Sequence, residues 1–318
     1  MKMRRLVSLC AIALFCLFVI YSADAREGAQ RGLVLWGTLL VPSLLPFFAA
    51  AGLLTRLGVI DAVCRRLTPR KGSGVFSGPA LGVFLLGLSG GYPLGAASAA
   101  EAVKAGSLSP EEGSELLVCC DNTGPAFAVG AIGTGLFGSA WWGLLLWGVH
   151  ALTAAAIAAV LCRKRRHSGA DLPRRSVTPP GEAFGAAVSG AVSALISIGG
   201  YVVFFSALLG VTEALGFPGS LSRTLAGIFG GQEAFFRALL TGILELSSGI
   251  GAMRGLPLSP ANLALASFLM GFGGLCVHMQ AAAVTREAGL HLKRRLPGKL
   301  LHGILSAAVT YPLGLLLM

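Results

Sequence analysis

The sequence is poor in charged residues, and acidic residues are the scarcest. Only 12% of its 318 residues are charged, with 14 Asp and Glu against 25 Lys and Arg. Soluble domains carry roughly 25% charged residues, whereas this chain is 54% hydrophobic with a mean hydropathy of +0.76. These values exclude a soluble protein. The long apolar runs favour membrane-spanning helices, because backbone polar groups inside a bilayer must be satisfied within the chain.

Motifs that mark metalloenzymes and metal sites are missing. The chain contains no HExxH, and we expect no enzyme; a carboxylate pair of Asp121 and Glu245 is the one enzyme hypothesis left open. The seven cysteines include no CxxC pair, and no histidine stands at metal-ligand spacing, which predicts no disulfide framework, no metal and no cofactor. The basic residues lie in short segments between apolar runs, so they predict topology and no nucleic-acid partner.

The distribution of basic residues conflicts with a simple count of membrane spans. Segments 56–71, 163–175 and 286–299 should all face the cytoplasm, because cytoplasmic loops collect Lys and Arg. Nine alternating spans cannot place all three segments on that side. The nine apolar runs are 6–22, 33–54, 73–100, 116–137, 141–161, 184–211, 235–252, 261–283 and 300–318.

Two glycine-rich runs resolve the conflict if each enters the membrane and returns to the side from which it came. Run 73–100 follows this pattern, with eight glycines between Gly72 and Gly95, and 235–252 is the weaker span of the second half. The two runs would enter from opposite sides. The predicted fold class is therefore an all-α integral membrane protein, polytopic, with an inverted-topology repeat of helices and two re-entrant hairpins.

This topology divides the chain into four parts. Residues 1–32 form an N-terminal transmembrane helix, with a signal-like segment cleaved near Ala25 as the alternative, and a short outer connector. Residues 33–162 form the first repeat and residues 184–318 the second, inverted repeat, joined by a basic cytoplasmic linker at 163–183. The predicted location is the cell membrane, with several passes, a cytoplasmic N-terminus and an outer C-terminus.

Polar residues interrupt the apolar runs in four places and form the candidate binding site. Glycines permit tight chain reversal, and an acidic residue inside the membrane is a functional hypothesis by default. The opposing interpretations are a purely structural turn at 89–93 and a neutral Glu245 bonded to a backbone carbonyl. The predicted substrate- or ion-binding residues are Ser89, Gly90, Gly91, Tyr92, Pro93, Asp121, Asn122, Thr123, Gly124, Pro125, Glu245, Ser247, Ser248, Gly249, Gly273, Gly274, His278 and Gln280.

Three further patterns predict local contacts. His278 and Gln280 stand two residues apart, so a helix would turn at most one of them toward the site. His150 is alone in an apolar run and predicts a hydrogen bond between helices rather than a ligand. Ser109 and Glu112 match a capping box and predict the start of a helix.

The polar segments and their surroundings form an ordered series of motifs. The matching segments are Arg31–Leu33, Val41–Phe48, Ser89–Gly95, Asn122–Gly138, His150, Leu244–Gly249 and Gly271–Gln280. Together they resemble the sporulation integral membrane proteins of YlbJ type. The resemblance implies the gate domain shared with nucleoside and ferrous-iron transporters, and a role in the spore envelope. Asp121 stands where relatives would have a neutral amide, and Cys276 where they would have serine, so the local chemistry would differ.

We therefore predict a permease-like membrane protein of endospore formation that moves a small polar solute or ion by alternating access. Glu245 or Asp121 would couple a proton or cation. The alternative is a non-transporting scaffold that recruits or stabilises other sporulation membrane proteins through small-residue helix faces. The expected partners are the lipid bilayer, an unknown solute or ion with a nucleoside among the candidates, and either a second copy of the chain or other sporulation membrane proteins.

Overall fold

The structure, a computed structural model, describes residues 2–67, 76–162 and 178–318. These residues form helices joined by turns, and no β-strand occurs among them. The prediction of an all-helical chain is therefore confirmed for the described part. Most of the predicted basic linker, residues 163–177, lies outside the described residues.

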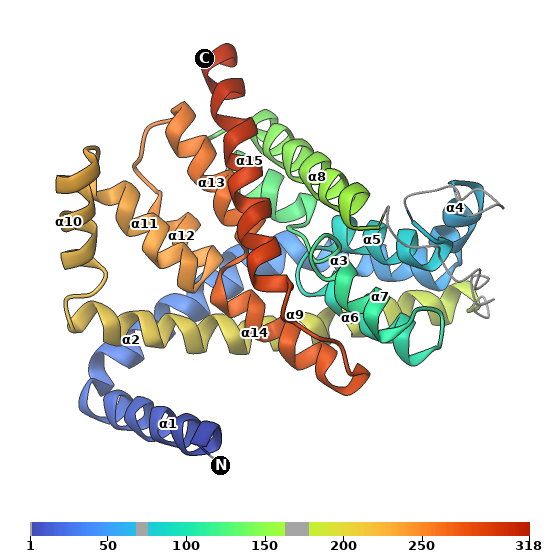
Figure 1. The fold of residues 1–318 in the computed structure, drawn as a ribbon, viewed down its shortest axis with the longest axis horizontal. Coiled ribbons are helices and arrows are strands. Elements are labelled where there is room, and N and C mark those ends of the chain that lie inside the picture. Colours follow the sequence, from blue (N-terminus) through green and yellow to red (C-terminus); the bar gives the residue numbers. More distant parts are fainter. Residues whose placement is uncertain (1, 68–75, 163–177) are drawn as a thin grey trace.

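The helices follow the apolar runs, but several runs are broken into shorter pieces (Figure 1). In residues 2–162 they are α1 Lys2–Ile20, α2 Ser22–Leu35, the π-helical η1 Trp36–Leu40, α3 Val41–Arg56, α4 Val59–Leu67, α5 Gly78–Gly90, α6 Leu94–Lys104, α7 Pro110–Leu116, the π-helical η2 Phe127–Thr134 and α8 Ala140–Cys162. In residues 178–318 they are α9 Pro180–Ala214, α10 Gly219–Phe229, α11 Glu233–Leu244, α12 Leu246–Ala252, α13 Pro260–Phe272, α14 Gly274–Thr285, the 3₁₀ turn η3 Arg286–Ala288 and α15 Arg295–Leu317.

The two halves of the chain have the same order of elements. Each begins with a helix of 35 residues, which is the continuous α2–η1–α3 (Ser22–Arg56) in the first half and α9 in the second. A short helix, a pair of helices, an interrupted helical segment and a long final helix follow in both halves. Because α2 runs through residues 23–32, the short connector expected there is helical.

The two 35-residue helices pack side by side and antiparallel (Figure 1). Near one end, a side chain on Gly28 would meet the backbone of Ser206; further along, a side chain on Gly52 would touch Ala187. Residue numbers therefore increase along one helix in the direction in which they decrease along the other. Glycine lets the two backbones approach closely at these points, as is common between membrane helices.

Both predicted hairpins fold back on themselves. Gly87 of α5 lies against Gly95 of α6, and Gly242 of α11 lies against Gly249 of α12. In the first pair the chain reverses at Gly91, whose φ of 82° favours glycine. The short distance between each pair of backbones explains why small residues occur there. Entry and exit on one side of a membrane stays a prediction for both hairpins.

The outer surface is strongly apolar. Five described helices are long and apolar enough to cross a membrane: Ser22–Arg56, Ala140–Leu161, Pro180–Ala214, Pro260–Ala288 and Arg295–Leu317. Large apolar side chains on the outer helices are exposed, among them Phe15 (69%), Leu152 (72%) and Leu316 (80%). A soluble protein rarely exposes such continuous apolar surface, so this surface is suited to lipid.

Candidate functional site

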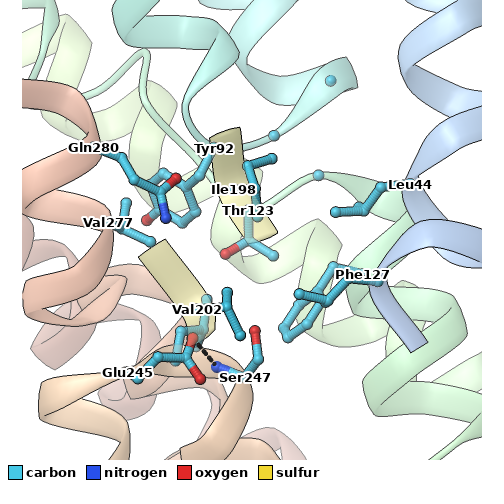
Figure 2. A pocket seen from close by; sticks show the side chains of 15 residues that line it. Leu44, Tyr92, Thr123, Phe127, Ile198, Val202, Glu245, Ser247, Val277 and Gln280 are labelled. Carbon is cyan, nitrogen blue, oxygen red and sulfur yellow. Dashed lines mark hydrogen bonds between the residues drawn. The ribbon is translucent and has the colours of Figure 1, made fainter. Parts of the chain in front are cut away.

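A cavity lies where both hairpins, both interrupted segments and both 35-residue helices meet (Figure 2). Its volume is about 50 Å³, measured as the space that the centre of a water molecule can occupy. Its polar side chains are those of Tyr92, Thr123, Glu245, Ser247 and Gln280. Its apolar lining comes from Leu40, Leu44, Phe127, Ile198, Val202, Leu246 and Val277.

The predicted site residues divide into those that line this cavity and those that do not. The lining residues are Gly90, Gly91, Tyr92, Thr123, Gly124, Glu245, Ser247 and Gln280. The others are Ser89, Pro93, Asp121, Asn122, Pro125, Ser248, Gly249, Gly273, Gly274 and His278. Each of the four polar segments thus contributes to the cavity, but ten of the eighteen predicted residues do not line it.

The break between α13 and α14 positions the hydroxyl groups of the cavity. Gly273 adopts a left-handed conformation (φ 85°) and ends α13, which leaves the carbonyl of Met270 without its helical partner. The hydroxyls of Tyr92 and Thr123 both donate to this carbonyl oxygen at 3.0 Å. Two side chains of the first half therefore donate hydrogen bonds to the carbonyl group that the helix break leaves free in the second half.

Glu245 occupies the tip of the second hairpin, between α11 and α12. Its carboxylate accepts hydrogen bonds from the backbone N–H groups of Ser247 (2.9 Å) and Ser248 (2.6 Å), and the residue is only 2% exposed. These two contacts fix the position of the carboxyl group at the hairpin tip, and whether it is charged or neutral stays a prediction.

Asp121 points away from the cavity into a cluster of buried charges. Its carboxylate pairs with the guanidinium of Arg295 and accepts from the backbone N–H of Ala96 at 3.4 Å. Lys299 donates to the main-chain oxygen of Asp121 at 2.7 Å. Arg295, Lys299 and Asp121 are 1%, 0% and 0% exposed. Buried charges at this depth must be paired to be tolerated.

The ammonium group of Lys299 is surrounded by acceptors. Besides Asp121, it donates to Oδ1 of Asn122 at 3.4 Å and to Nδ1 of His302 at 3.1 Å. All three of its N–H groups thus have a partner. It also lies 5.3 Å from the centre of the Tyr92 ring, whose face attracts cations. Tyr92 therefore separates the charge cluster from the cavity that it lines.

The histidines extend this cluster rather than the cavity. His302 donates through Nε2 to the carbonyl of His150 at 3.1 Å, and the two rings stack at 4.4 Å. Nε2 of His150 accepts from the backbone N–H of Thr123 at 3.1 Å. This side chain therefore forms a hydrogen bond as predicted, but its partner lies in the non-helical segment 121–124 and not in a second helix. His278 contacts Arg295 whereas Gln280 lines the cavity, so only one of that pair faces it, as predicted.

Sequence reasoning missed the buried side of α15. Arg295 and Lys299 were interpreted only as topology signals of segment 286–299, but both are buried against Asp121. The cytoplasmic side of that segment stays a prediction. Arg295, Lys299 and His302 lie at helical spacing with Ser306 and Thr310, and all five are buried. A polar stripe along one face of an apolar span was the signal that could have found them.

The relationship to known proteins agrees with this picture. The chain is similar to the Sporulation integral membrane protein YlbJ of Bacillus subtilis (strain 168), with 27% identity over 328 residues, covering 93% of this chain and 80% of the relative. It is a homologue of that protein. Together with the apolar helices, this similarity shows an integral membrane protein. No protein-family model and no solved structure matches the chain.

Proposed function

We propose that this protein is a permease-like membrane protein of endospore formation that moves a small polar solute or ion by alternating access. The observation that supports transport is the cavity shared by both hairpin tips and both interrupted segments. Such midplane sites, built from broken helices at the junction of two repeats, are typical of secondary transporters. The sporulation role follows from the name of the relative. In this proposal the protein is a carrier and not an enzyme.

The proposal includes two inverted halves with re-entrant hairpins. The antiparallel 35-residue helices and the repeated order of elements support it. Cysteine labelling in intact cells tests it. We expect cysteines at Leu67 and Ala105, which flank the first hairpin, to react only from the cytoplasmic side. Cysteines at Gln232 and Arg254, which flank the second, should react only from outside. Labelling of either pair from two different sides would contradict the proposal.

The native cysteines determine the background for this labelling. Cys10 and Cys16 are exposed and would be replaced by serine, as would Cys162. Cys64 can stay: it lies in α4, outside the five candidate spans, and burial, followed by the charge of Asp61, raises the pKa of its thiol to about 11. Since the thiolate is the reactive form, Cys64 should react little with maleimide at neutral pH.

A larger side chain in the cavity tests transport directly. Val277 is 6% exposed and lines the cavity, whereas Met279, on the same helix α14, is 55% exposed. We expect Val277→Phe to reduce spore formation to near the level of a strain lacking the protein, because phenylalanine would fill the binding space. Met279→Phe should leave spore formation unchanged. Spore counts, with immunoblots of the membrane fraction, provide the measurement.

The outcome also separates the carrier from the scaffold. A scaffold uses its outer faces, so Met279→Phe would then be the damaging change and Val277→Phe the tolerated one. Normal spore formation by a Val277→Phe protein present at wild-type amount would contradict transport through this cavity. If Val277→Phe removes the protein from the membrane, the smaller change Val277→Leu takes its place. We then expect a smaller reduction of spore formation.

A further inference from the structure

A short helix of the first half has an exposed apolar face that the proposed function leaves unexplained. α4 (Val59–Leu67) has nine residues and, at 1.5 Å per residue, is far too short to cross a bilayer. Gly58, with a φ of 72°, separates it from the preceding span α3. α4 therefore follows directly on the end of a span and lies at one edge of the molecule (Figure 1).

Two opposite sides of α4 differ in chemistry. Val59, Val63 and Leu67 follow one another at intervals of four residues, so they lie on one side of the helix. They are 40%, 37% and 63% exposed. Asp61 and Arg65 stand two residues after the two valines and therefore lie on the other side. An exposed helix with one apolar and one charged face is suited to the boundary between lipid and water.

The contact of α4 with the rest of the protein lies between these two sides. Cys64 is fully buried, and a Cβ added to Gly82 of α5 would lie 3.6 Å from its Sγ. The helix is thus attached by its flank to the first hairpin. This attachment leaves the apolar side free to enter lipid while the charged side stays in water.

Two arginines give α4 a positive charge that the protein does not balance. Arg65 and Arg66 are exposed, and no ion pair joins either of them to an acidic side chain in the described part of the chain. A guanidinium group stays protonated in proteins. The short helix at the same place in the second half differs, because Arg223 of α10 pairs with Glu233 at 3.8 Å. The charge on α4 is therefore available to an external anion.

We infer that α4 lies in the surface of the bilayer and binds anionic phospholipid, with Arg65 and Arg66 on the headgroup phosphates. Guanidinium groups bind phosphate through paired hydrogen bonds. Arg66 stands seven residues after Val59, about two helical turns, and so borders the apolar face, from which a long side chain can extend to the phosphates. A zwitterionic lipid offers the same apolar contact but no net negative charge. The inference applies to a carrier and to a scaffold alike.

Thermal unfolding of the purified full-length protein in detergent tests the role of the charge. Phosphatidylglycerol and phosphatidylcholine with identical acyl chains are added in increasing amounts, because a lipid that binds only the folded state raises its Tm. We expect a saturable rise that is larger with phosphatidylglycerol. In the double variant Arg65→Gln/Arg66→Gln the apparent affinity for phosphatidylglycerol should fall by about tenfold or more, since each basic residue near an anionic surface contributes about fivefold.

A second double variant controls for the loss of two positive charges. Arg223 and Arg237 pair with Glu233 and Glu213 within the protein, so Arg223→Gln/Arg237→Gln should respond to phosphatidylglycerol like the wild type. An equal response of the wild type to both lipids overturns the inference. It is also overturned if the variant of α4 keeps the full phosphatidylglycerol response, or if the control variant loses as much of it.

The depth of α4 in lipid is an independent measurement that keeps both arginines. Nitroxide labels are attached to Val63→Cys and, separately, to Asp61→Cys in protein without Cys10, Cys16 and Cys162, reconstituted into nanodiscs that contain phosphatidylglycerol. We expect the label at residue 63 to respond to oxygen, which concentrates in lipid, and the label at residue 61 to a water-soluble nickel chelate. If both labels respond as in water, as on a face that binds a soluble protein, the inference is wrong.

Discussion

Replacement of Asp121 by alanine is expected to lower the free energy of unfolding by about 3–5 kcal/mol, the usual loss when one partner of a buried ion pair is removed. The reason is that Arg295 and Lys299, at 1% and 0% exposure, would remain in the core without a carboxylate. The backbone N–H of Ala96 would lose its acceptor as well. Thermal unfolding in detergent, together with the yield of monodisperse protein, measures this effect.

Two further variants distinguish a coupled cluster from a general sensitivity to mutation. Glu287→Ala breaks an exposed ion pair with Lys104 and should change the Tm little, because surface pairs contribute little. Arg295→Met combined with Asp121→Ala should cost less than the sum of the two single changes, by about 1 kcal/mol or more, since the double variant leaves neither of that pair unpaired. Strictly additive losses would contradict direct coupling.

Gly87→Ala is expected to be the most damaging of the small substitutions. A Cβ at this position would overlap the carbonyl oxygen of Cys120 and lie 3.1 Å from the Cα of Gly95. Both obstacles are backbone, so they cannot move aside as a flexible side chain would. Overpacking of this kind costs about 3 kcal/mol or more where the surroundings cannot relax. The measurement is again the Tm and the yield of folded protein.

Gly148→Ala is the matched control for that substitution. Gly148 lies in α8, and an added Cβ would meet nothing within 4 Å. Alanine favours the helix by up to about 1 kcal/mol relative to glycine, so this variant should be neutral or slightly more stable. If both variants behaved alike, the close contact between the first hairpin and the segment around Cys120 would be wrong.

The positions at which the chain breaks its helices were predictable from the sequence because their causes are local. Gly91 and Gly273 adopt positive φ values that other residues rarely adopt, and the run of glycine, tyrosine and proline at 91–93 cannot continue a helix. The same holds for Ser109 and Glu112, whose capping box begins α7 as predicted. Each of these features depends on residues a few positions apart.

The division of the polar segments between cavity and charge cluster was not predictable in this way. Neighbouring Asp121 and Thr123 face different surroundings, the first toward Arg295 and the second toward the cavity. Their direction depends on the carbonyl of Met270, 147 residues further along the chain. A single sequence contains no local signal for a partner at that separation.

The sequence by itself determined that this is a helical membrane protein and that its helices break at 91–93 and at Gly273, because composition and backbone conformation act locally. Only the tertiary structure decided that Arg295 and Lys299 are buried partners of Asp121. It also decided that Glu245, and not Asp121, lines the cavity. Charge pairing depends on distance in space, and packing between α15, the 117–125 segment and the hairpin tips sets those distances.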